Sequence, residues 1–319
     1  MIDRETATLL DALEAGFPRV ESMTGPQARK AIRARFRRNP TPVRMHRVDD
    51  RTIPGPGGDL PVRIYQPAPD SSTASLPAIV FAHGGGFVFC DLDTHDDLCR
   101  AMANGVGAVV ISVDYRLAPE HRWPAAANDV AAAIGWVNAH SVELGIDADR
   151  VVVAGDSAGG NLAAVAAILI RDRGGPVLSG QALLYPVVAA DFTTDSYRRF
   201  GRGFYNTESA MRWYWDQYVP STDDRGHAHA SPLHADLTGL PPTLIVTAGH
   251  DPLWSEGTQL SRALDAAGVP TIHRDHPGAI HGFMTMPTLT ICAEARERTW
   301  LDLRGMLSTT RVRRSPTPG

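Results

Sequence analysis

Residues 150–160 read RVVVAGDSAGG, and the apolar run Leu162 to Ile170 follows almost directly. The pattern predicts a buried strand, a sharp turn with Ser157 at its tip, and then a helix. Gly155 and Gly159 flank the serine by two positions, and residues without a Cβ let the backbone turn sharply enough to expose the hydroxyl. The pentapeptide alone would favour a plain turn of small residues, so the interpretation depends on a second motif.

That second motif is HGGGF at residues 83–87, which ends the apolar run 78–82. An acyl-transfer enzyme needs N–H donors for the oxyanion of its tetrahedral intermediate, and consecutive glycines let bare backbone approach that oxygen. We predict that the N–H groups of Gly85, Gly86 and Ala158 form this oxyanion hole. A glycine-rich loop without a ligand is the alternative for the motif alone. We also expect valine at Gly86 to abolish turnover with little change in thermal stability, provided that the backbone φ there is one that valine can adopt.

The order of residues along the chain supplies the rest of a catalytic triad. In an α/β-hydrolase the acid follows a late strand and the histidine follows the last one. Residues 242–249 read as such a late strand and end before Asp251, the predicted acid. Residues 271–276 alternate like a half-exposed strand, and the loop beyond them carries His281, the predicted base. His276 is a weaker choice because it lies at the expected strand end.

Together with DYRLAPEHRWPAA at residues 114–126, these motifs resemble the hormone-sensitive-lipase-like family of bacterial carboxylesterases and lipases. The resemblance covers roughly residues 60–305 and implies an α/β-hydrolase fold: a mostly parallel central sheet with helices on both faces and a helical cap. It also implies the triad Ser157, Asp251 and His281 and the hydrolysis of short- to medium-chain acyl esters. One departure is that Trp254-Ser255 follows DPL where relatives usually carry a charged pair, which questions the local support of Asp251.

The organisation along the chain predicts a core with two additions. Amphipathic helical patterns at 5–16 and 26–38 precede the core, whose strands are expected to begin near Val43. We divide the chain into N-terminal cap helices at 1–50, core at 51–190, an inserted cap segment at 191–225, core at 226–308 and a disordered tail at 309–319. Aromatic residues concentrate in the inserted segment. The predicted substrate-binding residues are Phe87, Phe204, Tyr205, Trp213 and Phe283.

Composition limits the partners and the cofactors. The chain of 319 residues has a net charge of −4, which gives no general attraction to nucleic acid. No run of about 18 apolar residues predicts a transmembrane segment, and residues 1–17 lack the apolar core of an export signal. The three cysteines form no CxxC, which is typical of a reducing cytoplasm. We therefore expect a cytoplasmic location.

Other enzyme classes are excluded by missing residues. Lys30 is the only lysine, so no P-loop and no lysine for a Schiff base in the core is available. No GxGxxG follows a strand, and His227, His229 and His234 lie in a polar loop without metal-ligand spacing. We expect no cofactor and no metal.

The sequence therefore predicts a serine carboxylesterase that acts on a small acyl ester, and the family resemblance implies a homodimer. An amidase, a carbamate hydrolase or an acetyl-sugar deacetylase with the same triad stays open, because sequence does not separate these bonds. A small-ligand receptor that keeps the fold without catalysis is the further alternative.

Overall fold

A computed structural model describes residues 1–68 and 75–308, and within them eight strands form one sheet. The spatial order of the strands is β1-β2-β4-β3-β5-β6-β7-β8. The first two pairings in this order, β1 with β2 and β2 with β4, are antiparallel, and all the others are parallel. The strands are β1 Arg47–Gly55, β2 Gly58–Gln66, β3 Leu76–Ala82, β4 Val109–Val113, β5 Ile146–Asp156, β6 Gly180–Leu184, β7 Thr243–His250 and β8 Thr271–Ile280.

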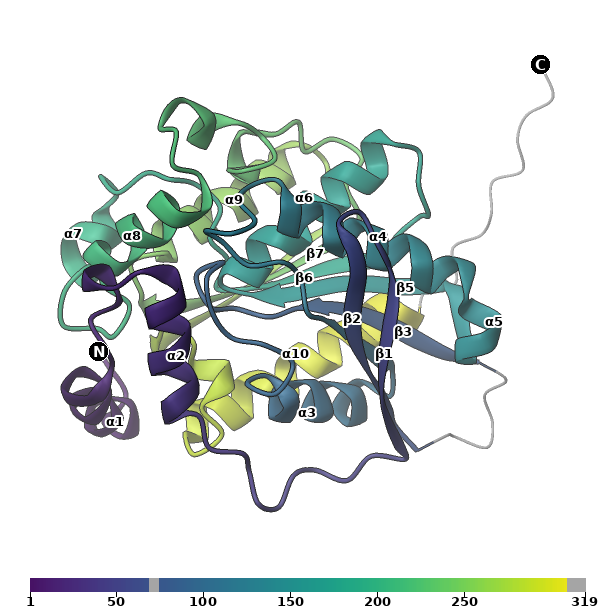
Figure 1. The fold of residues 1–319 in the computed structure, drawn as a ribbon, viewed down its shortest axis with the longest axis horizontal. Coiled ribbons are helices and arrows are strands. Elements are labelled where there is room, and N and C mark those ends of the chain that lie inside the picture. The colour runs from purple at the N-terminus through teal and green to yellow at the C-terminus, as the bar shows by residue number, and fades with distance from the viewer. Residues whose placement is uncertain (69–74, 309–319) are drawn as a thin grey trace.

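Helices cover both faces of the sheet, as parallel strands with continuous apolar runs require (Figure 1). The helices are α1 Arg4–Gly16, α2 Gly25–Arg35, α3 Asp96–Val106, α4 Ala125–Ala139, α5 Ser141–Leu144, α6 Ala158–Asp172, α7 Asp195–Phe200, α8 Glu208–Tyr218, α9 Trp254–Ala266 and α10 Thr290–Ser308. Short 3₁₀ turns cover Val20–Ser22, Asp223–Gly226, Pro232–His234 and Phe283–Thr285. This arrangement is the predicted α/β-hydrolase fold.

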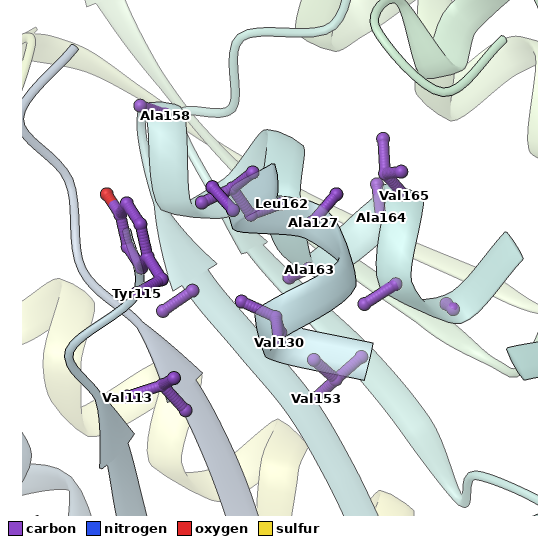
Figure 2. Close-up of a cluster of buried hydrophobic side chains, with 14 of the residues drawn as sticks. Val113, Tyr115, Ala127, Val130, Val153, Ala158, Leu162, Ala163, Ala164 and Val165 are labelled. Carbon is purple, nitrogen blue, oxygen red and sulfur yellow. The ribbon is translucent and has the colours of Figure 1, made fainter. Parts of the chain in front are cut away.

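The core lies in two layers, one on each face of the sheet. Strand β3 shows the alternation: Val80 packs in the layer with α4, α6 and α9, whereas Ile79 and Phe81 pack in the layer with α3 and α10. Figure 2 shows part of the first layer, where Leu162 and Ala163 of α6 and Val130 of α4 lie above Val153 of β5. The small side chains let α6 pack close to the strands, which fixes the position of its first residue, Ala158, relative to the sheet.

The two additions to the core begin with well-defined helix caps. Asp3 caps α1 by accepting hydrogen bonds from the N–H groups of residues 5 and 6, and Thr24 forms a capping box with Gln27 at the start of α2. Thr194 and Thr207 cap α7 and α8 in the same way. These four helices lie near one another beyond the ends of the strands (Figure 1).

The strand limits differ from the expected ones in two places. The first strand begins at Arg47 and not near Val43. Strand β8 continues to Ile280, so His276 lies within the strand and not at its end. The predicted tail at 309–319, and residues 69–74 of the expected polar loop before β3, lie outside the described residues.

Candidate active site

The structure joins Ser157, His281 and Asp251 by a continuous chain of hydrogen bonds. The Nε2 atom of His281 is 2.9 Å from Ser157 Oγ, and Nδ1 of the same ring is 2.7 Å from Asp251 Oδ2. The three residues follow β5, β7 and β8, whose carboxyl ends meet at one edge of the parallel sheet. All three residues are buried, so water competes little for these contacts.

Ser157 has a strained backbone, as the predicted turn requires. Its φ of 55° and ψ of −118° lie outside the regions that residues with a Cβ prefer, and its N–H donates to Leu184 O at 2.8 Å, which holds the turn against β6. A Cβ on Gly159 would come within 2.0 Å of Ala82 O, and one on Gly155 would come within 2.2 Å of Gly159 O. Glycine at both positions therefore allows the strand and the helix to meet closely behind the serine.

Asp251 has its own local support despite the Trp254-Ser255 departure. The N–H of Leu253 donates to Asp251 Oδ1 at 3.0 Å, which leaves Oδ2 for His281. The N–H of Ser255 donates to Ser196 Oγ, and that hydroxyl donates to Pro252 O at 2.6 Å. The inserted segment thus holds the turn after Asp251, a contact for which the sequence gives no signal.

Glu256 is a second buried carboxyl group close to this turn. Its Oε1 accepts hydrogen bonds from the N–H groups of Val188 at 2.7 Å and Ala189 at 3.4 Å, while Oε2 has no partner. Burial raises the pKa of Glu256 well above its ordinary value. Glu256 therefore attaches the backbone after β6 to α9, and the protonated form is the favoured one.

We expect Glu256→Gln to stabilise the protein relative to the wild type, and increasingly so as the pH rises from 5 to 8. The unfolded glutamate releases its proton above its ordinary pKa and the folded one only at a higher pH, so wild-type stability falls as the pH rises between these two values, by at most about 1.4 kcal/mol per pH unit. Glutamine keeps an acceptor for Val188 and carries no titrating proton. Thermal unfolding at several pH values measures this, and a difference in Tm that is independent of pH would contradict it.

The HGGGF loop lies beside Ser157. The N–H of Gly84 donates to Asp156 Oδ1 at 2.7 Å, so this N–H is not available to a substrate. The next two glycines, Gly85 and Gly86, line the pocket beside Ser157. Gly85 has a φ of 122°, and a Cβ there would come within 2.2 Å of Phe89 O. Ala158 is the first residue of α6, whose N-terminal N–H groups have no partner within the helix. The structure thus places Gly85 and Gly86 in the lining of the pocket beside Ser157, and Ala158 directly after the serine at the start of α6.

The expectation for Gly86→Val is wrong in one respect. The φ of Gly86 is 58°, which a β-branched residue adopts only with strain, and a Cβ there would come within 2.3 Å of the Tyr214 ring. The substitution would therefore disturb the fold as well as the approach of a substrate. It does not separate catalysis from stability.

The DYRLAPEHRWPAA motif holds the HGGGF loop in place through hydrogen bonds. The hydroxyl of Tyr115 donates to His83 O at 2.7 Å, and the N–H of Ala118 donates to Phe87 O at 2.9 Å. The guanidinium of Arg116 binds the buried carboxylate of Asp129 through two nitrogens, which anchors the motif to α4. Both ends of the glycine loop are thus held by backbone or hydroxyl groups of this motif.

Two histidines complete the surroundings of Asp156. The Nε2 atom of His95 lies 3.2 Å from Asp156 Oδ1. Burial alone would raise the pKa of Asp156, but His95 and the Gly84 N–H together hold it below its ordinary value. Burial also lowers the pKa of His83 to about 4. His83 is therefore neutral near pH 7, and its Nδ1–H donates to Gly84 O at 2.7 Å.

A pocket of about 120 Å³ opens beside Ser157 and His281, and we call it the catalytic pocket. Of the predicted substrate-binding residues only Tyr205 lines it. Phe87 stacks on Tyr218 with ring centroids 3.9 Å apart, and Phe283 packs against Tyr185 in the core. The remaining residues of the lining are Phe17, Gly84, Gly85, Gly86, Phe89, Cys90, His95, Asp156, Asn206, Tyr214, Gly282 and Thr285.

Two more of the predicted substrate-binding residues do not line the catalytic pocket. Trp213 is buried, and its Nε1–H donates to Met23 O at 3.1 Å between α8 and the N-terminal segment. Phe204 stacks on His250. The prediction missed Phe17 and Tyr214, because an aromatic residue on an amphipathic helix looks the same in sequence whether it faces a pocket or the core.

Comparison with known proteins identifies the class of this chain. A family model described as "alpha/beta hydrolase fold" matches residues 79–285. A carboxylesterase, NlhH, of Mycobacterium tuberculosis (strain CDC 1551 / Oshkosh) is 40% identical over 306 residues, which cover 93% of each chain. An ethyl acetate hydrolase of Pseudomonas putida is 38% identical over 237 residues, which cover 73% of this chain and 74% of the relative.

The solved structures agree with the sequence relatives. A hyperthermophilic esterase from Pyrobaculum calidifontis superimposes with a TM-score of 0.88 at 38% identity, covering 97% of this chain and 99% of that one. The chain therefore belongs to the α/β-hydrolase fold family, and the resemblance to the hormone-sensitive-lipase-like esterases is confirmed. In the part of the chain that the structure describes, no helix has the length and apolar character needed to cross a bilayer.

Proposed function

We propose that the protein is a serine carboxylesterase that hydrolyses short- to medium-chain acyl esters through an acyl-enzyme on Ser157. The reaction class is that of its family, and the chain is a carboxylic ester hydrolase. The observation that carries the proposed mechanism is the Asp251–His281–Ser157 chain of hydrogen bonds at the wall of a pocket that Gly85 and Gly86 also line.

The reaction would proceed in two steps. His281 Nε2 accepts the Ser157 proton as Oγ attacks the ester carbonyl, and Asp251 stabilises the imidazolium that results. The N–H groups of Gly85, Gly86 and Ala158 hold the oxyanion. The ester C–O bond breaks, His281 gives its proton to the leaving alcohol, and Ser157 keeps the acyl group. His281 then takes a proton from water as the water oxygen attacks the acyl carbon, and it returns that proton to Ser157 Oγ as the acyl–Oγ bond breaks and the acid leaves.

The volume of the catalytic pocket predicts the acyl preference. About 120 Å³ accommodates a short acyl group and not a long one. We expect kcat/KM for p-nitrophenyl esters to be highest between acetyl and hexanoyl and to fall by about tenfold or more at dodecanoyl, because a long chain would have to displace packed side chains. A profile that rises towards dodecanoyl would contradict this assignment of the pocket.

A small organophosphate tests the proposed nucleophile in the same preparation. Only an activated serine reacts readily, so one equivalent should bind to Ser157, as mass spectrometry of the peptide would show, and turnover should stop in proportion. Phosphorylation elsewhere would overturn the assignment of Ser157. No turnover of any ester and no reaction would favour the receptor alternative, and cleavage of p-nitroacetanilide at a similar rate would favour an amidase.

Two further properties belong to the proposal. A cytoplasmic location and a homodimer stay predictions, which fractionation of cells and light scattering of the purified protein would test.

A further inference from the structure

A second cavity lies next to the catalytic pocket. It has a volume of about 500 Å³ and lies between the N-terminal segment and the inserted segment. We call it the outer cavity. Phe17 and Tyr205 line both the outer cavity and the catalytic pocket, and no other residue in the described part of the chain does. These two side chains therefore form the partition between the two spaces.

The partition is built from two separate chain segments. The rings of Phe17 and Tyr205 meet edge to face, with centroids 5.0 Å apart. Phe17 directly follows α1, and Tyr205 belongs to the loop between α7 and α8. The N–H of Tyr205 donates to Glu14 Oε1 at 3.2 Å, which links this loop to α1. Tyr205 has a φ of 69°, which is strained for a residue with a Cβ.

The partition lies on the leaving-group side of the candidate triad. A Cβ on Gly282 would be 3.9 Å from Tyr205 Cε1, so the tyrosine ring lies beside the residue that follows His281. The Tyr214 ring, in contrast, lies against Gly86 of the predicted oxyanion hole. The histidine gives its proton to the departing alcohol, so the alcohol part of an ester must lie near His281 and not near Gly86.

The lining of the outer cavity combines apolar side chains with charges of both signs. Leu13, Pro18 and Val20 supply apolar surface, and Arg19 and Arg202 are exposed. The charged residues of the lining are balanced, with the acids Glu14, Glu21 and Glu208 and the bases Arg19, Arg202 and Arg212. Such a surface offers hydrogen-bond donors and acceptors without a net charge, which suits a neutral group that carries several oxygens better than an acyl chain or an ion.

From these observations we propose that the outer cavity binds the alcohol part of the substrate, and that Phe17 and Tyr205 limit the size of that part. The substrate class is then the esters of short acids with bulky, oxygen-rich alcohols. This inference rests on the proposed function, because it needs Ser157 to hold the acyl group and His281 to protonate the alcohol.

The test compares two acetates with the same acyl group. The ratio of kcat/KM for glucose pentaacetate to kcat/KM for ethyl acetate, measured by acid release at constant pH, reports on the alcohol part alone. Ser209→Trp fills the outer cavity from an exposed position of α8 and is expected to lower this ratio about tenfold. Tyr205→Gly removes the partition with a residue that suits the positive φ, and is expected to raise the ratio about tenfold.

A matched control comes from the same N-terminal segment. Phe36 lines neither cavity, so Phe36→Ala is expected to keep the ratio within about twofold. A ratio taken within one variant is independent of the fraction of active protein, and titration of Ser157 with a small organophosphate shows that each variant is folded. Ratios of Ser209→Trp and Tyr205→Gly that both stay within twofold of the wild type would overturn the proposal.

The acyl series separates the remaining outcomes. Ser209→Trp could instead change the ratio of kcat/KM for p-nitrophenyl hexanoate to kcat/KM for p-nitrophenyl acetate and leave the ratio for glucose pentaacetate and ethyl acetate unchanged. In that case the outer cavity binds the acyl chain and the assignment is wrong. If the wild-type protein hydrolyses none of these esters, the proposed function itself fails. This outcome differs from failure of the outer-cavity assignment, in which the esters are hydrolysed and the ratios do not change.

Discussion

Ser157→Ala is expected to lower kcat/KM for p-nitrophenyl acetate by about 10⁴-fold or more, because the members of a catalytic triad act as a unit. The Oγ atom is the only atom lost, and it is the one that His281 Nε2 contacts at 2.9 Å. Alanine has the same backbone restrictions as serine, so the strained φ of 55° costs the variant no more than the wild type. The expected result is therefore a folded protein without turnover.

Steady-state kinetics and thermal unfolding on one preparation measure both parts of this result. Ser179→Ala is the matched control, because it removes another buried serine hydroxyl, which donates to Asp149 O near the amino-terminal ends of β5 and β6, whereas Ser157 follows the carboxyl end of β5. Activity close to that of the wild type in a folded Ser157→Ala protein would show that another group is the nucleophile.

Asp251→Asn is expected to lower kcat by about 10³- to 10⁴-fold with the fold intact, through the wrong tautomer of His281. The Leu253 N–H donates to Oδ1 at 3.0 Å, so an asparagine would keep its carbonyl oxygen there and turn its NH₂ group towards His281 Nδ1. The histidine would then have to accept at Nδ1 and carry its proton on Nε2. A protonated Nε2 cannot take the proton of Ser157.

The control for this variant is Asp275→Asn, since Asp275 is an exposed carboxylate on β8 that contacts Thr247 and Trp254 and no member of the triad. Circular dichroism shows whether both variants are folded. An Asp251→Asn protein that keeps a tenth or more of wild-type kcat would mean that His281 is oriented by something other than Asp251.

The sequence predicted the fold and the candidate triad because the signals for them are local. The strand, turn and helix around Ser157 need glycine at 155 and 159, where a Cβ would collide with backbone oxygens. Asp251 follows a buried strand and His281 follows a half-exposed one, and parallel strands bring their carboxyl ends to one edge of the sheet. Each of these features depends on residues that are neighbours in the sequence, so the sequence alone is enough to predict it.

The support of those residues was only partly visible in the sequence. Glu256 and Asp156 accept hydrogen bonds from the N–H groups of Val188 and Gly84, which are 68 and 72 residues away along the chain. Trp254-Ser255 raised a doubt about Asp251 that Ser196 resolves from the inserted segment. Contacts of this kind have no periodicity that a sequence would show.

By itself, then, the sequence determined the sheet, the turn at Ser157 and the order of the candidate catalytic residues. Only the tertiary structure decided which other aromatic side chains reach the catalytic pocket: Phe17 and Tyr214 do, whereas Phe87 and Phe283 pack into the core. The physical reason is that a turn or a buried strand is specified by its own residues. The lining of a pocket depends on how helices from distant parts of the chain pack together. The apolar pattern of a helix is the same whether its apolar side chains face a pocket or the core.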